Sequence, residues 1–260
     1  MAVLFQSAVN PFDGPAAEMT ILVISDIHAN LTALEAVLSD AGNVEAVWCL
    51  GDLVGYGPDP NECIARVRQL PGMVCILGNH DAAALGQIDI EAFNVEARLS
   101  IEWLLSKLSH ESLDFLGGLP ERMVMDHVTL AHGSPRNPVW EYVLDTRTAL
   151  RNFDHFDTPF CFIGHTHLPL VYQLDETRSR ISLIVSQPDE QWPLVNRALL
   201  NPGSVGQPRD HNPRASYALY DPVGNTWVNR RVSYDVPAVQ KRILEAGLPP
   251  RHALRLAEGW

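Results

Sequence analysis

The sequence predicts an α/β fold in which two β-sheets stack on each other and helices cover their outer faces. In the first half of the chain, apolar runs with strand character alternate with segments of helical periodicity. The second half consists mainly of short strand-like runs separated by turn-forming residues. Mixed strands and helices followed by mostly antiparallel strands favour two packed sheets with helices outside.

The first half contains three predicted strands and three predicted helices. Asn30 is the expected N-cap of the first helix, which ends near Gly42. Pro60 is expected to open the second helix, because proline is well tolerated in a first helical turn. A broad apolar face predicts a longer third helix over residues 90–107. The three strands are expected at residues 21–24, 46–50 and 73–77.

The second half contains eight predicted strands. Asp126 and His127 are expected to form a two-residue turn between the first two of these strands. Two further helices are predicted at residues 146–153 and 236–246. The eight strands are expected at residues 122–125, 128–131, 160–163, 170–174, 181–185, 198–200, 216–221 and 226–233.

One domain is predicted over residues 20–246, with a flexible N-terminal arm over residues 1–19 and a C-terminal tail over residues 247–260. No apolar run approaches the roughly 18 residues that a membrane span requires, and the start lacks the pattern of a secretory signal. The four cysteines are expected to be small, reduced core residues. We therefore expect a cytoplasmic protein without a membrane partner.

The charge of the chain restricts its partners. The formal net charge is −12 at pH 7, and no basic stripe is present in the sequence. Such a balance repels nucleic acid at long range, so long nucleic acids are not expected as partners. A small anionic substrate remains compatible, because bound cations would reverse the local field. The sequence leaves the oligomeric state open.

Polar residues of the types that bind metals directly follow five of the predicted strands. The carboxyl ends of core strands meet at one edge in α/β enzymes, so we expect these side chains to gather there. Each cluster alone could be a helix cap or a turn, and their joint occurrence makes that explanation improbable. The clusters are Asp26 with His28, Asp52, Asn79 with His80 and Asp81, His132, and His165 with His167.

These residue types fit two divalent cations that share one carboxylate. Asp52 follows a glycine and suits the shared position. Oxygen and imidazole ligands without thiolate favour Mn, Fe, Zn, Ni or Co. Two such ions about 3.5–4 Å apart neutralise phosphate oxygens and hold a bridging water as hydroxide near neutral pH. The pattern therefore predicts hydrolysis of a phosphate ester by attack of that hydroxide.

These clusters, in this order, resemble the calcineurin-like metallophosphoesterase superfamily, and residues 51–61 and 201–206 resemble loops of its small bacterial and archaeal phosphodiesterase branch. The resemblance implies a four-layer αββα sandwich of two mixed sheets flanked by helices. It also implies that His80 faces the leaving group as the catalytic residue. The implied ligands are Asp26, His28, Asp52 and His167 for one metal, and Asp52, Asn79, His132 and His165 for the other.

One position departs from the family pattern. Many members carry an aspartate three residues after the one matched by Asp52, and it pairs with the histidine matched by His80. Here that position is Gly55. Protein phosphatase activity becomes a weaker prediction, and Asp81 is left as a candidate partner for His80.

The most favoured function is a phosphodiesterase for a small phosphorylated or nucleotide substrate. A phosphomonoesterase or protein phosphatase, a nuclease and a non-catalytic metal-stabilised binding protein remain alternatives. Arg136 and Arg209 lie in predicted loops and could hold a phosphate. The remaining histidines are expected at the surface or in turns: His110, His127, His155, His211 and His252.

Overall fold

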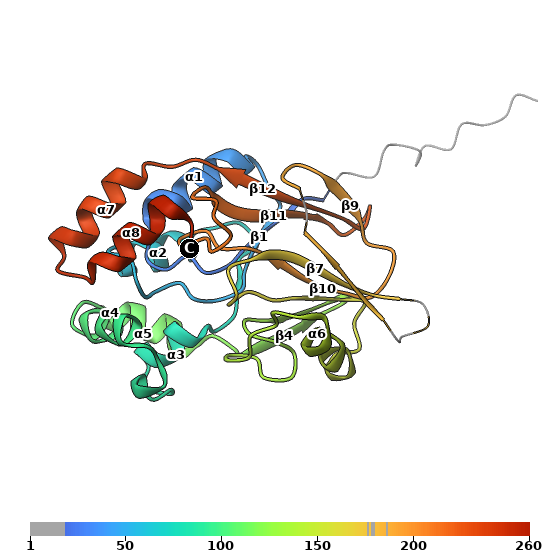
Figure 1. The fold of residues 1–260 in the computed structure, drawn as a ribbon, viewed down its shortest axis with the longest axis horizontal. Helices are drawn as coiled ribbons and strands as arrows, with labels where there is room; N and C mark the ends of the chain where they lie inside the picture. Colours follow the sequence, from blue (N-terminus) through green and yellow to red (C-terminus); the bar gives the residue numbers. More distant parts are fainter. Residues whose placement is uncertain (1–18, 176, 178–179, 186) are drawn as a thin grey trace, which may run out of the picture.

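The computed structural model describes residues 19–175, 177, 180–185 and 187–260, and it shows the predicted α/β architecture. Two six-stranded mixed sheets pack face to face, with helices on their outer sides (Figure 1). The predicted N-terminal arm lies outside the described residues, apart from Met19. Among the helices that the structure describes, none has the length and apolar composition needed to cross a membrane.

The first sheet has the strand order β3-β2-β1-β11-β12-β9. Its strands β1, β2 and β3 are parallel, whereas β11, β12 and β9 add antiparallel pairs. The carboxyl ends of the three parallel strands therefore open at the same edge. The bounds are β1 Ile21–Ile24, β2 Ala46–Cys49, β3 Val74–Cys75, β9 Gln191–Pro193, β11 Ala215–Asp221 and β12 Thr226–Val232.

The second sheet has the order β4-β5-β6-β10-β7-β8. Strands β5, β6 and β10 are parallel, and the outer pairs are antiparallel. The ends of β5 and β6 supply the second set of polar loops. The bounds are β4 Arg122–Met125, β5 Val128–Ala131, β6 Phe160–Phe162, β7 Pro169–Leu174, β8 Ile181–Ile184 and β10 Ala198–Pro202.

Helices α1 and α2 pack on the first sheet and α6 lies beside the second, whereas α3 to α5, α7 and α8 lie at one end of the sandwich (Figure 1). Asn30 caps α1 as predicted, since its side chain accepts a hydrogen bond from the amide of Ala33. The bounds are α1 Leu31–Ala41, α2 Pro60–Val67, α3 Asn79–Ala84, α4 Val95–Leu105, α5 His110–Gly117, α6 Thr146–Asn152, α7 Val236–Glu245 and α8 Pro250–Glu258, with 3₁₀ turns at Ile90–Ala92 and Phe153–His155.

Most of the core lies between the two sheets. Val23 from the first sheet and Phe162 and Leu200 from the second belong to one fully buried apolar cluster. Separate clusters pack α1 on the first sheet and α6 on the second. Burial on both faces fits the continuous apolar runs seen in the sequence, which are typical of strands covered on both sides.

Two helical segments differ from the prediction. The helix predicted over residues 90–107 is a 3₁₀ turn followed by α4, because the side chain of Asn94 caps a new helix at the amide of Ala97. Residues 247–260, predicted to be a tail, contain α8. Its buried Leu256 packs against Val239 and Ile243 of α7. The short elements α3, α5 and β9 were not predicted.

Candidate metal centre

The structure brings every predicted site residue to one edge of the sandwich. Four ligand candidates, Asp26, His28, Asp52 and Asn79, follow the parallel strands of the first sheet, and the three others follow β5 and β6 of the second. All are nearly inaccessible to solvent, with at most 3% of each residue exposed. These buried residues are Asp26, His28, Asp52, Asn79, His80, His132, His165 and His167.

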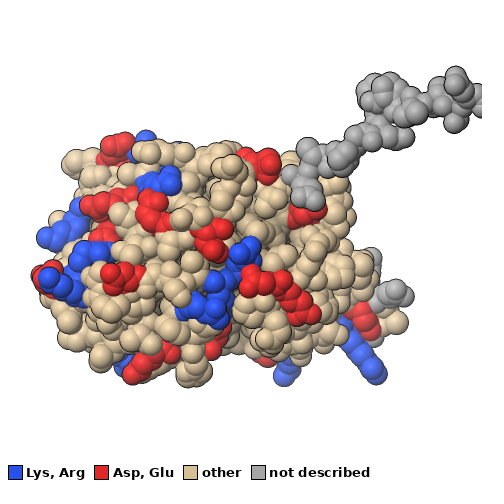
Figure 2. All heavy atoms as spheres, turned by 90° about the horizontal axis from the view of Figure 1, so that it is seen from above, with Lys and Arg blue, Asp and Glu red and all other residues tan. Residues whose placement is uncertain are grey.

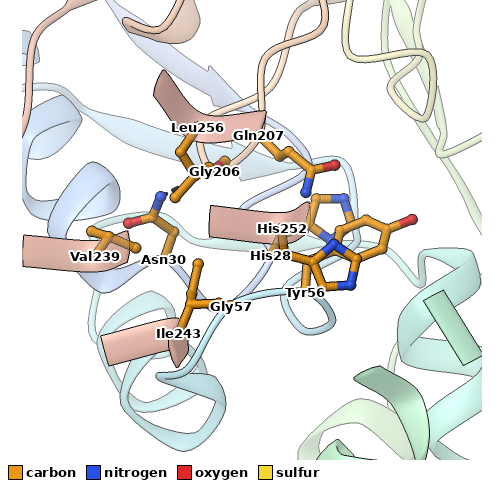
Figure 3. A pocket seen from close by; sticks show the side chains of 10 residues that line it. All are labelled: His28, Asn30, Tyr56, Gly57, Gly206, Gln207, Val239, Ile243, His252 and Leu256. Atoms are coloured by element: carbon orange, nitrogen blue, oxygen red, sulfur yellow. Dashed lines mark hydrogen bonds between the residues drawn. The ribbon is translucent and has the colours of Figure 1, made fainter. Parts of the chain in front are cut away.

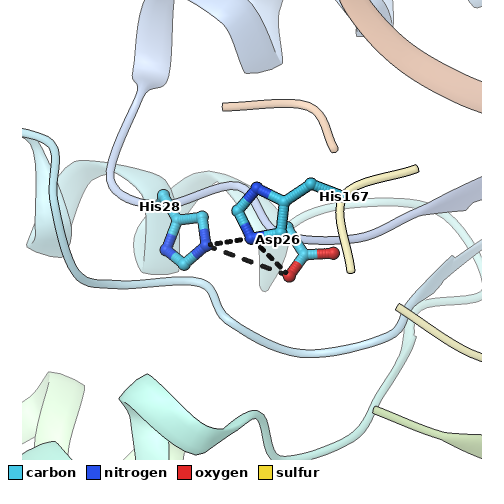
Figure 4. A group of neighbouring side chains, drawn as sticks. All are labelled: Asp26, His28 and His167. Atoms are coloured by element: carbon cyan, nitrogen blue, oxygen red, sulfur yellow. Dashed lines mark hydrogen bonds and ion pairs between the residues drawn. The ribbon is translucent and has the colours of Figure 1, made fainter. Parts of the chain in front are cut away.

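The first group comprises Asp26, His28 and His167 (Figure 4). Nδ1 of His28 donates to the carbonyl of Val54, and Nδ1 of His167 donates to that of Gln207. Both neutral rings therefore present unprotonated Nε2 atoms, which lie only 3.2 Å apart. Oδ1 of Asp26 lies 3.3 Å from Nε2 of His167 and has no hydrogen-bond partner among the described residues. A cation between these atoms would satisfy all three.

The second group comprises Asp52, His132 and His165, with Asn79 beside them. Nε2 of His132 lies 3.0 Å from Oδ1 of Asn79 and 3.4 Å from Oδ2 of Asp52. Nε2 of His165 donates to the carbonyl of Trp140, so its Nδ1 is left as the acceptor. These donor atoms could hold a second cation.

Asp52 lies between the two groups. Its Oδ2 is 3.6 Å from Nε2 of His28 and 3.4 Å from Nε2 of His132. Its Oδ1 accepts a hydrogen bond of 2.8 Å from the amide of His80, which fixes the carboxylate. One carboxylate can therefore reach both sides of the centre.

Most of the ligand candidates have a left-handed backbone, which is rare for residues other than glycine. Such a conformation costs about 1–3 kcal/mol and is found mainly at functional sites. It turns each side chain sharply away from the preceding strand and into the edge. The φ angles are 53° for Asp26, 47° for His28, 53° for Asp52, 64° for His165 and 61° for His167.

Close backbone packing holds these loops in place. A Cβ atom on Gly51 would lie 2.6 Å from the amide nitrogen of Gly78, so neither loop has room for a side chain there. On the other side, Ser204 Oγ and the amide of Gly206 both donate to the carbonyl of Asp26, at 2.8 and 2.9 Å. Glycine at these positions thus permits the crowded geometry that aims the ligands.

Burial sets the charge of the site histidines. It lowers the pKa of three of them well below the usual range, which favours the neutral form that binds metals. Burial also raises the pKa of Asp26 to about 6. His132 differs, because the Asp52 carboxylate outweighs the effect of burial and raises its pKa to about 10. The three neutral histidines are His28, His165 and His167.

His80 is held by aromatic rings. Its ring centroid lies 4.4 Å from that of Tyr56, 5.0 Å from that of His28 and 5.1 Å from that of Phe93. Its Nδ1 is buried and has no hydrogen-bond partner among the described residues, and a Cβ atom on Gly55 would lie only 2.5 Å from it. Burial lowers the pKa of His80 to about 4.

Asp81 does not orient His80. Its Oδ1 accepts from the amides of Leu53 and Val54, and its Oδ2 accepts from the amide of Gly78. The suggested pairing with His80 is therefore wrong, and Asp81 instead ties α3 to the loop that carries Asp52. Asp81 lies in the first turn of α3, from which its carboxylate reaches the amides of Leu53 and Val54 on one side and of Gly78 on the other.

Tyr56 and His252 were not predicted as parts of the site. Tyr56 has a φ of 60°, and its ring lies 4.5 Å from His28, 4.4 Å from His80 and 4.8 Å from His252. His252 was expected at the surface but is 1% exposed, because α8 inserts it behind Tyr56 (Figure 3). Its Nε2 donates to the carbonyl of Glu96. The other four histidines without a motif are exposed, as predicted.

The two candidate phosphate-binding arginines differ. Arg136 forms an ion pair with Glu141. Arg209 has no carboxylate partner among the described residues, and its guanidinium lies 5.9 Å from the ring centroid of Tyr56. It also interacts with the hydroxyl groups of Tyr56 and Tyr142. Arg209 is therefore placed to meet an anion at the metal centre, whereas Arg136 is engaged elsewhere.

Two aromatic residues on the loop after His132 also escaped the sequence analysis. The ring of Tyr142 stacks on that of His165 with 3.7 Å between centroids and 29° between planes, yet Tyr142 remains 44% exposed. Trp140 packs edge-on against Phe93, 5.0 Å away. The two closely spaced aromatic residues in Trp140-Glu141-Tyr142, shortly after the His132 cluster, are the signal that could have identified them.

Similarity to known proteins agrees with this arrangement. Residues 19–225 match the calcineurin-like phosphoesterase superfamily domain. An uncharacterized protein of Methanocaldococcus jannaschii is 36% identical over 241 residues, which cover 88% of this chain and 93% of that protein. The crystal structure of a metallophosphoesterase from Sphaerobacter thermophilus is 47% identical, covers 94% of this chain and 100% of its own, and superposes with a TM-score of 0.86.

A more distant similarity concerns a protein with a named substrate. The symmetrical bis(5'-nucleosyl)-tetraphosphatase of Thioalkalivibrio sulfidiphilus is 28% identical over 153 residues, which cover 53% of this chain and 55% of that protein. The match thus spans about half of each chain. The domain match and the full-length relatives show that this chain belongs to the calcineurin-like phosphoesterase superfamily and is a hydrolase of phosphoric esters.

Proposed function

We propose that the protein is a two-metal phosphodiesterase for a small phosphorylated or nucleotide substrate. The observation that carries the proposal is the position of Asp52, whose Oδ2 lies within 3.6 Å of a histidine nitrogen from each ligand group. The first cation would be held by Asp26, His28, Asp52 and His167. The second would be held by Asp52, Asn79, His132 and His165.

The protein's own groups would bind and orient the substrate. When bound, the two cations would supply charge neutralisation and activation of water. Carbonyl groups at Val54, Leu50 and Gln207 fix the ring orientation of three ligand histidines, which keeps the donor atoms aimed inward. Arg209 would hold a phosphate oxygen beside the centre.

His80 would protonate the departing oxygen, provided that the negative charge of a bound phosphate offsets the burial that lowers its pKa to about 4. Its ring is fixed by Tyr56 and Phe93 rather than by a carboxylate, and its backbone amide binds the shared Asp52. It follows a ligand candidate, Asn79, and its ring lies next to the first ligand group. If the phosphate bound between the two ligand groups, the His80 ring would be close enough to the centre to meet the leaving group.

A small substrate fits the surface charge. Figure 2 shows acidic and basic side chains interspersed over one face, without a continuous basic stripe. The formal net charge of −12 opposes binding of a long nucleic acid. The distant similarity to a tetraphosphatase supports a nucleotide carrying several phosphates. We expect the protein to act in the cytoplasm.

A substrate panel with controlled metal loading tests this function. Chelator-stripped protein would be reloaded with Mn²⁺, Fe²⁺, Ni²⁺ or Zn²⁺ and assayed on phosphomonoesters, phosphodiesters, cyclic nucleotides and dinucleoside polyphosphates. We expect two metal equivalents per chain and the highest kcat/KM on a diester or polyphosphate. One equivalent or none contradicts the proposal. Preference for monoesters favours the phosphatase alternative, and metal-loaded protein inactive on every ester favours a binding protein.

A further inference from the structure

Tyr142 is partly exposed to solvent although its ring stacks on a buried ligand candidate. One face stacks on His165, a candidate ligand whose own exposure is 2%, while 44% of Tyr142 remains open to solvent. The residue thus extends from the buried centre to the surface. An aromatic ring in this position offers a flat surface to any group that binds beside the second ligand group.

The loop that presents Tyr142 is anchored on its opposite side. Glu141 accepts hydrogen bonds from Ser134 Oγ at 2.7 Å and from Asn152 Nδ2 at 2.9 Å, and it forms an ion pair with Arg136. Anchoring Glu141 therefore holds the loop segment that carries the rings of Trp140 and Tyr142, which reduces the entropy that a ligand must overcome.

The rest of the entrance is also aromatic and cationic. Trp140 lies 5.0 Å from Phe93, and Phe93 lies 5.1 Å from His80. The carbonyl of Trp140 accepts from His165, so backbone and ring contacts both join this wall to the second ligand group. Arg209 interacts with the hydroxyl of Tyr142, and its guanidinium lies 5.9 Å from the ring centroid of Tyr56. A phosphate at the centre would then have an aromatic wall and a cation next to it.

We propose that Tyr142, supported by Trp140, is a stacking subsite for the nucleobase of the substrate. The proposal rests on the proposed phosphoesterase function and narrows its substrate to nucleotides. The base would lie on the exposed face of Tyr142 while the phosphate reaches the second ligand group beneath. Base–aromatic stacking is worth about 1–3 kcal/mol, or roughly 5- to 150-fold in binding.

Two diesters with the same leaving group separate stacking from chemistry. Thymidine 5'-(p-nitrophenyl) phosphate and methyl p-nitrophenyl phosphate would be compared on Mn²⁺-loaded protein. The measured quantity is the ratio of their kcat/KM values. Tyr142→Leu should lower this ratio by about tenfold, within the range for loss of one stacked base. Tyr142→Phe and Tyr142→Trp keep a ring and should retain the wild-type ratio.

Leu144→Ala is the matched control, because Leu144 is an exposed apolar residue of the same loop. It should leave the ratio unchanged. An unchanged ratio in Tyr142→Leu would overturn the proposal, even if both rates fell together. Such a parallel loss would mean that Tyr142 only positions His165.

Binding by calorimetry covers the case in which neither diester is hydrolysed. Thymidine 5'-monophosphate and inorganic phosphate would be titrated into Mn²⁺-loaded wild type and Tyr142→Leu. A selective, roughly tenfold weakening of nucleotide binding supports the subsite even if the hydrolase proposal has failed. Equal changes for both ligands, or none, would overturn the subsite.

Discussion

The two halves of the metal centre differ in what covers them. The group of Asp26, His28 and His167 is closed from behind by Tyr56 and by His252 of α8, with only a cavity of about 10 Å³ left between them (Figure 3). The second group lies beneath an aromatic loop whose outermost ring remains 44% exposed. We infer that substrate approaches over the second group and that the first is mainly enclosed by the fold.

Asp52 lies between the two ligand groups, so its substitution should lower the activity more than any other change proposed here. Asp52→Asn weakens the shared ligand and removes a charge that offsets both cations. We expect kcat/KM to fall by at least about 10⁴-fold, because groups that act as a unit fail together. Elemental analysis should show fewer than two metals per chain. Retention of two metals and activity would exclude a shared role.

His80 should produce the next largest effect, without loss of metal. His80→Ala is expected to lower kcat by about 10²–10⁴-fold, the usual contribution of a positioned general acid. The loss should shrink for a nitrophenolate leaving group, which barely needs a proton. A uniform loss across leaving groups would remove the general-acid assignment, and metal loss would make His80 a ligand.

Substitution of His252 tests whether the residues behind the group of Asp26, His28 and His167 contribute to stability and not to substrate binding. His252→Ala removes a buried ring and should reduce the free energy of unfolding by about 1–3 kcal/mol, or roughly 2–10 °C in Tm. The selectivity between nucleoside and methyl diesters should not change. His211→Ala, at an exposed histidine, is the control for Tm. A change in selectivity instead of Tm would place His252 on the substrate side.

Substitution of Glu141 tests whether this residue anchors the loop that carries Tyr142. Of the four substitutions, it should change the free energy of unfolding or the activity least. Burial would raise its pKa, but Arg136 and two hydrogen-bond donors hold that pKa at about 2. Its contribution to stability is therefore present above its ordinary pKa of 4.5 and is lost as the pH falls toward about 2.

Urea unfolding of wild type and Glu141→Gln at several pH values measures this contribution. The difference in unfolding free energy should be below about 1 kcal/mol at pH 7, since the pair is partly screened by solvent. The difference between the two unfolding free energies should become smaller from pH 4.5 to pH 3 and should stay constant above pH 5. Glu121→Gln, at an exposed glutamate, is the control for the removal of one carboxylate from the surface. A difference that grows on acidification would contradict the assigned anchor.

The sequence could predict the ligand candidates because each directly follows a strand. Strand ends depend on local apolar runs, and the parallel order brings those ends together. Asp26 and His165 are therefore adjacent in space although 139 residues separate them. Two stacked sheets with outer helices followed from the same runs and were confirmed, as were strands such as β4 and β5 with their bounds.

The surroundings of the ligands could not be predicted in this way. His252 enters the site because α8 folds back on α7, a long-range packing event that leaves no local signal at the histidine. Tyr142 lies in a loop whose path depends on the contacts of Glu141. Asp81 was a candidate partner for His80 and accepts from backbone amides instead, since adjacency in sequence does not show which groups a carboxylate faces.

The ligand groups draw on both sheets, and this has a kinetic consequence. The amide of His165, after β6, donates to Asp26, after β1, and His132, after β5, donates to the carbonyl of Leu50, after β2. Two cations at this edge would cross-link the sheets as a disulfide does, by joining distant segments. Separation of the sheets would then wait for metal release, so the loaded protein should unfold slowly and resist proteolysis for longer.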